Sequence, residues 1–253
     1  WPGRPEPAVC RFAGGRFEHV DMGLEPTERL YDMDEGPDGA IWLGTSHGIV
    51  RWHGGRLQRW SSEEGLAIPR VFAIAADPEG RVWFGHQSGG AGLGVLHEGR
   101  IRYRTMLHGL AHDEVWDLAV GEDGAVWAAT SNGLSRLAHD ELVSFQAPSG
   151  LDHPDIWPVL PDGDSVYVGT KGGGVYVLDL TEAERPAPRV VIDEPLVAEG
   201  RAHLSWRARA HNGEIGPDHV QTRFRIDGDP WSAWDTRRKV DLMKTRAGEH
   251  TLA

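Results

Sequence analysis

The sequence predicts an all-β fold, with a partial β-propeller of about four blades, each of four antiparallel strands, followed by an immunoglobulin-like β-sandwich. Three observations predict it. A motif such as DGAIWLGTSHG recurs at a regular interval, short β-rich runs alternate with Gly and Asp turns, and helical periodicity is nowhere sustained. A four-stranded unit of about 40 residues has the size of a propeller blade.

Two sequence markers keep the same period. The first is an aromatic residue in each repeat of the motif, at Trp42, Trp83, Trp127 and Tyr167. Successive members are 41, 44 and 40 residues apart. The second is a Gly-Leu pair, which begins at Gly23, Gly65, Gly109 and Gly150, with spacings of 42, 44 and 41 residues. We expect the aromatic rings to pack between neighbouring blades, because large apolar rings are usually buried in the core.

The third unit illustrates the four strands of a blade. The runs VWDLAV, AVWAAT, LSRLA and LVSFQA occupy 115–120, 125–130, 134–138 and 142–147. An Asp-Gly turn, an Asn-Gly turn and a polar turn separate them, and these residue types favour tight hairpins. The aromatic residue lies on the second strand, and a small residue two positions later leaves room for close packing.

The repeat also indicates where the blades begin and end. Residues 8–20 match the outer half of the following unit, 49–60, and predict half of an earlier blade. Full units start near residues 23, 65, 109 and 150, and the fourth has no clear outer strand. A seven-bladed ring would need roughly 290 residues at this period, so we expect further blades outside this chain.

The propeller segment is predicted to span 1–180. A charged linker that contains Pro186 follows at 181–187. Alternating runs such as AHLSWRARA and VQTRFRIDG predict the sandwich at 188–253, cut short at its C-terminal end.

Composition excludes several classes of function. The net charge of −12 argues against a nucleic-acid or anionic-membrane surface, and the single cysteine, Cys10, permits no internal disulfide. No metal-ligand spacing, phosphate loop or nucleophile motif is present, so we expect no cofactor, no metal and no catalytic residue. The acidic stretch DMDEGPDG fails as a calcium loop because Leu43 stands at the twelfth position.

The motif D-G-x-x-W-x-G-T-x-x-G resembles the two-component regulator propeller repeat, and the tail from Phe224 to Ala253 resembles the three-tyrosine (Y_Y_Y) domain, with Phe224 where Tyr is usual. The resemblance implies the sensor region of a hybrid two-component, histidine-kinase-type regulator on the periplasmic face of a bacterial inner membrane. It implies a small-molecule or oligosaccharide ligand, self-association through the sandwich, and a membrane segment and output domain outside this chain.

In an antiparallel blade, the loop before the first strand and the loop between the second and third strands lie on one face. Irregular loops on a rigid scaffold are where binding groups usually lie. The candidate ligand-binding residues on this face are His47, Arg70, His86, His112, Asp113, Trp116, His153, Asp155, Trp157 and Lys171. Of these, Trp116 and Trp157 are next to the innermost strands and could stack on sugar faces at the mouth of the channel.

Two alternatives stay open. The chain could be a propeller lyase of the virginiamycin B lyase type, with a metal and with His112 or His153 as the base. It could also be a non-catalytic interaction scaffold. The appended sandwich and the lack of a converging acid–base pair favour the sensor.

Overall fold

The computed structural model describes residues 9–147, 150–181, 189–198, 201–209, 220, 222–227, 229–233, 236–243 and 251. Contacts divide the chain into two compact units, Trp1–Arg136 with Leu142–Thr181, and Leu137–Glu141 with Glu182–Ala253. The described residues form strands and short 3₁₀ turns, with no α-helix. None of the described helices has the length and apolarity needed to cross a membrane.

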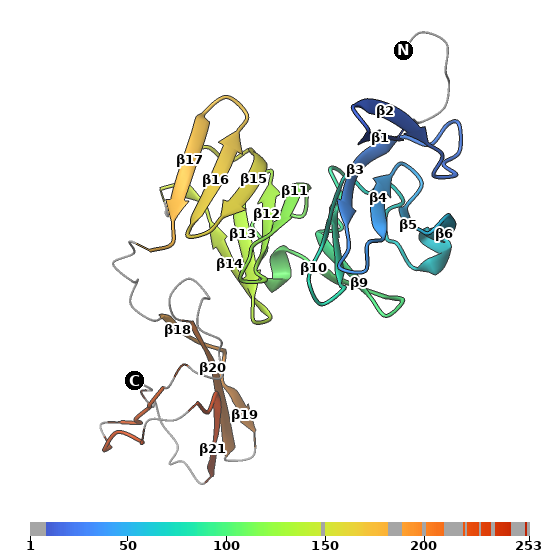
Figure 1. Ribbon diagram of the computed structural model, residues 1–253. Coiled ribbons are helices and arrows are strands. Elements are labelled where there is room, and N and C mark those ends of the chain that lie inside the picture. The colour runs from blue at the N-terminus through green and yellow to red at the C-terminus, as the bar shows by residue number, and fades with distance from the viewer. Residues whose placement is uncertain are drawn as a thin grey trace. The chain divides into compact units, whose positions relative to one another are not determined.

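The first unit is a series of antiparallel sheets in which each strand pairs with the next one along the chain, as Figure 1 shows. Blade 1 comprises β3 (Leu30–Glu35), β4 (Ile41–Thr45), β5 (Ile49–His53) and β6 (Arg56–Trp60). Blade 2 comprises β7 (Ala73–Ala76), β8 (Val82–Gly85), β9 (Leu93–His97) and β10 (Arg100–Arg104). Blade 3 comprises β11 (Val115–Val120), β12 (Val126–Thr130), β13 (Gly133–Ala138) and β14 (Glu141–Phe145). The prediction of an all-β, blade-forming repeat is confirmed.

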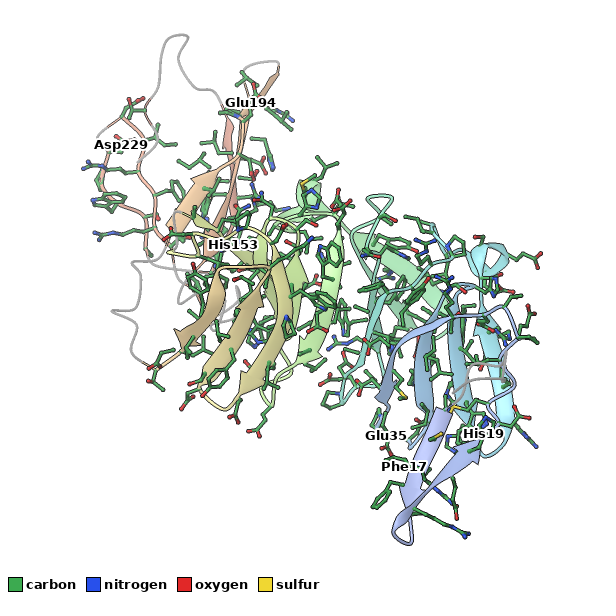
Figure 2. All side chains as sticks on the ribbon, turned by 90° about the horizontal axis from the view of Figure 1, so that it is seen from above. Phe17, His19, Glu35, His153, Glu194 and Asp229 are labelled. Atoms are coloured by element: carbon green, nitrogen blue, oxygen red, sulfur yellow. The ribbon has the colours of Figure 1, made fainter. Side chains whose placement is uncertain are left out.

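Two sheets of this unit have fewer than four strands. Blade 4 comprises β15 (Ile156–Asp162), β16 (Ser165–Thr170) and β17 (Gly174–Asp179). The hairpin β1 (Val9–Ala13) and β2 (Arg16–Val20) precedes blade 1 and packs on it through Val9. Phe17 lies on this hairpin and is 76% exposed (Figure 2). The repeat predicted half a blade at residues 8–20 and a fourth unit with no clear outer strand.

The repeated aromatic residue lies on the second strand of every blade. Trp127 is fully buried and packs against Ile156 and Val166 of blade 4. Trp83 is 5% exposed. Tyr167, in blade 4, is 40% exposed, because the described residues contain no blade beyond it. The rings therefore act as apolar plates wherever a following blade is present.

The Gly-Leu marker has a local cause that the sequence did not reveal. Short 3₁₀ turns, η1 (Ser62–Glu64) and η2 (Met106–His108), end at Gly65 and Gly109, whose φ angles are +101° and +100°. Glycine adopts this left-handed conformation without the penalty of a Cβ atom. Leu66 and Leu110 are buried, so in these two units the marker ends a turn and supplies an apolar anchor.

The second unit contains β18 (Arg189–Ile192), β19 (Leu196–Ala198), β20 (Arg201–Arg209) and β21 (Lys239–Met243). β20 pairs with each of the other three strands. Trp206 is buried, donates a 3.0 Å hydrogen bond to Thr222 Oγ1 and lies 5.5 Å from the Phe224 ring. The two-sheet sandwich and the three-tyrosine domain stay predictions, and the linker beyond Thr181 lies outside the described residues.

Candidate ligand-binding site

One aromatic side chain from each blade lies at the beginning of the innermost strand. The four residues, which we call the aromatic arc, are Tyr31, Phe72, Trp116 and Trp157. Ring centroids are 5.4 Å apart from Tyr31 to Phe72, 6.0 Å from Phe72 to Trp116 and 5.9 Å from Trp116 to Trp157. Phe72 also lies 6.4 Å from Trp157. The rings form one continuous cluster across four blades.

The backbone places these rings through irregular strand pairing. The register of the first strand against the second shifts between Leu30 and Asp32, between Val115 and Asp117, and between Ile156 and Val159. The aromatic residue of each of these blades lies within the shift. β-Bulges are known to redirect a side chain out of the regular alternation. Bulges in the same place in three blades therefore turn the rings to one end of the inner strands.

Backbone hydrogen bonds join the two loops that carry this end of each blade. Ser46 N–H donates to Arg29 O, Ser131 N–H to Glu114 O and Lys171 N–H to Asp155 O. These bonds link the loop before the first strand to the loop between the second and third strands. The two loops therefore lie together on one face, as the strand order predicted.

A polar chain holds the ring of Trp116. Its Nε1–H donates a 2.7 Å hydrogen bond to Ser131 Oγ, and Ser131 Oγ–H donates a 2.8 Å bond to Glu114 Oε2. The indole edge is thus satisfied by protein, and the half-buried ring keeps part of its surface open. Trp157 is 52% exposed, so the arc presents accessible aromatic surface.

Two carboxylates lie directly beside the arc, each one residue after an aromatic member. Asp32 Oδ2 accepts a 2.8 Å hydrogen bond from Ile74 N–H, and Asp117 Oδ2 accepts a 2.9 Å bond from Val159 N–H. Burial raises the pKa of both carboxyls, and the charge of Asp32 raises the pKa of Asp117 further. The site is therefore aromatic and locally acidic.

The other predicted residues are spread over the same loops. The side chains of His47, Arg70 and Lys171 are exposed, and those of His112, Asp113, His153 and Asp155 are half-buried. Figure 2 labels His153, which lies in the loop before β15. Of the ten predicted residues, the structure joins Trp116 and Trp157 in one ring cluster. For all ten, contact with a ligand stays a prediction.

His86 differs from the rest because its side chain is fully buried. Its Nδ1 lies 2.7 Å from Arg70 O, which requires a proton on Nδ1, and burial lowers the pKa of the ring. It stands at the end of the second strand, where Thr45 and Thr130 stand in blades 1 and 3. We therefore leave His86 out of the proposed ligand contacts.

Tyr31 and Phe72 were missed at the level of sequence. A usable signal was present, because successive members of the arc along the chain are 41, 44 and 41 residues apart. This is the blade period. A search for any aromatic residue at that period, instead of for Trp alone, finds the arc.

Among the residues that the structure describes, no group of three or more His, Cys, Asp or Glu side chains is arranged to hold a metal ion.

Comparison with known proteins supports the fold. No protein-family model matches the chain, and no curated protein matches it by sequence. Among solved structures, the chain is similar to the extracellular domain assigned to a hybrid two-component system of B. thetaiotaomicron. The identity is 16%, the TM-score is 0.58, and the match covers 96% of this chain and 44% of that chain.

Two further structures are less similar. A second extracellular domain of B. thetaiotaomicron, also assigned to a hybrid two-component system, is 14% identical over 97% of this chain and 51% of that chain, with a TM-score of 0.44. A gluconolactonase of Xanthomonas campestris is 17% identical over 70% of this chain and 66% of that chain, with a TM-score of 0.48. At 16% identity the likeness to the first structure establishes the fold alone, and this chain spans less than half of that structure.

Proposed function

We propose that this chain is the ligand-sensing region of an extracytoplasmic, membrane-bound signal-transduction protein, and that the aromatic arc is its ligand-binding site. The arc is the observation that carries the proposal. Four blades each place an aromatic ring at the same end of the inner strand, and the rings are in contact across the blades. Trp157 is 52% exposed and Trp116 is half-buried, so both rings are accessible to a ligand.

The chemistry of the arc favours an oligosaccharide or a similar small molecule. Aromatic rings offer large, rigid apolar faces, and a binding site needs only a few polar groups to orient a ligand on them. Glu114 and Asp117 supply acceptors for hydroxyl or amine donors beside Trp116. Accessible aromatic faces with acceptors at their edge match a sugar ring, which has an apolar C–H face and a rim of hydroxyl groups.

The sensor role draws support from the architecture. The fold match to an extracellular domain of a two-component system extends over almost the whole chain, so it includes both units. A ligand can signal only if it binds one arrangement of the protein better than another. We propose that the second unit, residues 188–253, carries that difference onward through self-association, and that the membrane segment and output domain lie outside this chain.

A panel screen tests the proposal. The purified chain is mixed with neutral and acidic oligosaccharides, including cellohexaose and oligogalacturonate, and its thermal midpoint is measured. Binding to the folded state raises the midpoint by mass action. We expect at least one glycan to raise the midpoint of the wild type, and Trp157→Ala to abolish that shift.

Tyr167→Ala is the matched control, because Tyr167 is an aromatic residue of the same blade with a similar exposed fraction, but outside the arc. It should leave the shift intact. If a glycan still raises the thermal midpoint of the Trp157→Ala variant, the glycan binds outside the aromatic arc. Metal-dependent turnover of a lactone, with no glycan shift, would favour the lyase alternative.

A further inference from the structure

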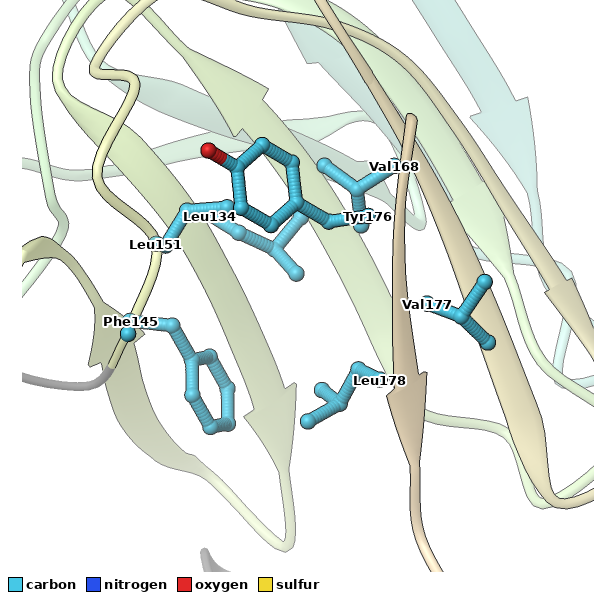
Figure 3. Close-up of a pocket in the computed structure, with 8 residues that line it drawn as sticks. Leu134, Phe145, Leu151, Val168, Tyr176, Val177 and Leu178 are labelled. Carbon is cyan, nitrogen blue, oxygen red and sulfur yellow. The ribbon is translucent and has the colours of Figure 1, made fainter. Parts of the chain in front are cut away.

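Blade 4 ends after its third strand, and an apolar groove runs beside that strand. The outer edge of β17 has no partner strand among the described residues. The adjoining cavity of about 100 Å³ is lined by side chains of blades 3 and 4, chiefly Leu134, Phe145, Leu151, Val168, Tyr176 and Leu178. Figure 3 shows Phe145 on one side of this groove and Tyr176 and Leu178 on the other.

Blade 2 shows what normally fills this place. Its fourth strand, β10, directs Ile101 and Tyr103 into the apolar cluster between blades 1 and 2. Ile101 is paired with Leu96 of the third strand, which in turn is paired with Val82 of the second. These two apolar side chains, two residues apart, close the interface between neighbouring blades.

The third strand of blade 4 has equivalent positions, but no described fourth strand lies over them. Leu178 is paired with Val166 of the second strand, as Leu96 is paired with Val82 in blade 2. Tyr176 follows two residues before it and is paired with Val168. Both side chains pack against the cluster between blades 3 and 4, and no described fourth strand covers them. Blade 4 therefore has the seat for a fourth strand.

A glycine at the start of the third strand gives an independent sign. A Cβ atom on Gly48 would lie 2.1 Å from the carbonyl oxygen of Trp60, and one on Gly92 would lie 2.3 Å from that of Arg104. These oxygens belong to the fourth strands of blades 1 and 2. Gly174 is the equivalent residue of blade 4, because the Thr170 hydroxyl donates to its carbonyl as the Thr45 hydroxyl donates to Gly48.

A Cβ atom on Gly174 would meet nothing within 4 Å. Its positive φ of +86° favours glycine in any case, yet the space beside it is the space that a fourth-strand carbonyl occupies in the other blades. The clearance and the open groove lie along the same edge of β17.

We propose that the groove receives a fourth strand supplied by propeller chain outside these 253 residues, which adds antiparallel to β17 with two apolar side chains, two residues apart, facing blade 3. Strand addition at a sheet edge combines backbone hydrogen bonds with pockets for alternate side chains. The hairpin β1–β2 supports this source, because it supplies only the outer strands of another blade.

A synthetic strand tests the seat directly. The probe is the peptide EGRIRYRT, residues 98–105, which contains β10. Its control is EGRIYRRT, which has the same composition and charge but makes Ile and Tyr adjacent, so that the two side chains cannot both face the groove in any register. Fluorescence anisotropy should show saturable binding of the probe and binding at least tenfold weaker for the control. Equal binding of the two peptides would overturn the proposal.

Gly174→Ala tests whether the probe adds to the outer edge of β17, because the new methyl group would clash with a backbone carbonyl of the added strand. It should weaken binding of the probe at least tenfold. Gly163→Ala is the matched control, since Gly163 also has a positive φ, +55°, and open space around a Cβ atom. It should bind the probe like the wild type. Binding that survives Gly174→Ala would overturn the proposal even if both variants lose similar stability.

The source of the strand is tested by hydrogen exchange. In the 253-residue chain, outward-facing amides of β17 should exchange rapidly. In the protein expressed from the complete reading frame, the same amides should be at least a hundredfold more protected. Equal exchange in the two proteins, or protection that appears only on dimerisation of the 253-residue chain, would assign the edge to another occupant and overturn the proposal.

Discussion

The carboxylate of Asp117 accepts a 2.9 Å hydrogen bond from the backbone N–H of Val159, which lies 42 residues further along the chain. Asp32 makes the same bond to Ile74 N–H at 2.8 Å and at the same separation of 42 residues. Both carboxylates are on the innermost strand of one blade, and both amides are on the innermost strand of the next. Neighbouring blades are therefore joined at their inner strands by carboxylates as well as by apolar plates.

Two substitutions of Asp117 should distinguish the contribution of its hydrogen bond to stability from the contribution of its charge. Asp117→Ala leaves the Val159 N–H without its acceptor, and we expect a loss of about 1–3 kcal/mol in the free energy of unfolding. Asp117→Asn keeps an acceptor oxygen and removes the charge, so its stability should lie within about 1 kcal/mol of the wild type. Urea denaturation of the three proteins at pH 7 measures both differences. An alanine variant as stable as the asparagine variant would show that the hydrogen bond contributes nothing.

The stability difference between Asp117→Asn and the wild type should depend on pH. Burial raises the pKa of Asp117 above its usual value of 3.8, so the folded protein holds this proton more tightly than the unfolded chain. The wild type therefore loses stability, relative to the variant, as the pH rises from 3.8 through the raised pKa. Above that window the difference should be constant. A wild type that gains stability relative to the variant as the pH rises through this window would contradict the direction of the shift.

Close packing between blades should make one glycine irreplaceable. A Cβ atom on Gly85 would lie 2.6 Å from Val115 Cβ in blade 3, and neither backbone can move freely within its sheet. We expect Gly85→Ala to cost about 1–3 kcal/mol. Gly44→Ala is the comparison, because the same position in blade 1 has its nearest contact at 3.0 Å, with Val71 O. Thermal denaturation should show a larger loss for Gly85→Ala, and the reverse order would contradict this packing.

The sequence predicts much of this fold because the repeat constrains it at every period. Trp42, Trp83 and Trp127 mark the second strands, since a large ring and a nearby small residue are needed wherever two sheets pack face to face. The half blade and the three-stranded blade follow from the same alignment. The second unit has no internal repeat, so its strands give only an alternation that several β folds share, and the sandwich stays a prediction.

The candidate site is predictable in part. Trp116 and Trp157 stand out as rare residues next to inner strands, whereas Tyr31 and Phe72 resemble ordinary strand residues until the bulges place them. The role of Asp117 was also hidden, because its partner is a backbone amide and no side-chain pattern marks such an acceptor. The sequence predicts contacts within one repeat better than contacts between repeats.

The central claim is that the aromatic arc contacts the ligand, and indole resonances measure this directly. The ¹⁵N–¹H spectrum of the chain gives one indole signal for each Trp, and single Trp→Phe variants assign those of Trp116, Trp157 and Trp206. On titration with a glycan that raises the thermal midpoint, the account predicts shifts in the signals of Trp116 and Trp157 and none in that of Trp206, which lies in the second unit. Saturable glycan binding that leaves Trp116 and Trp157 unshifted would contradict the account.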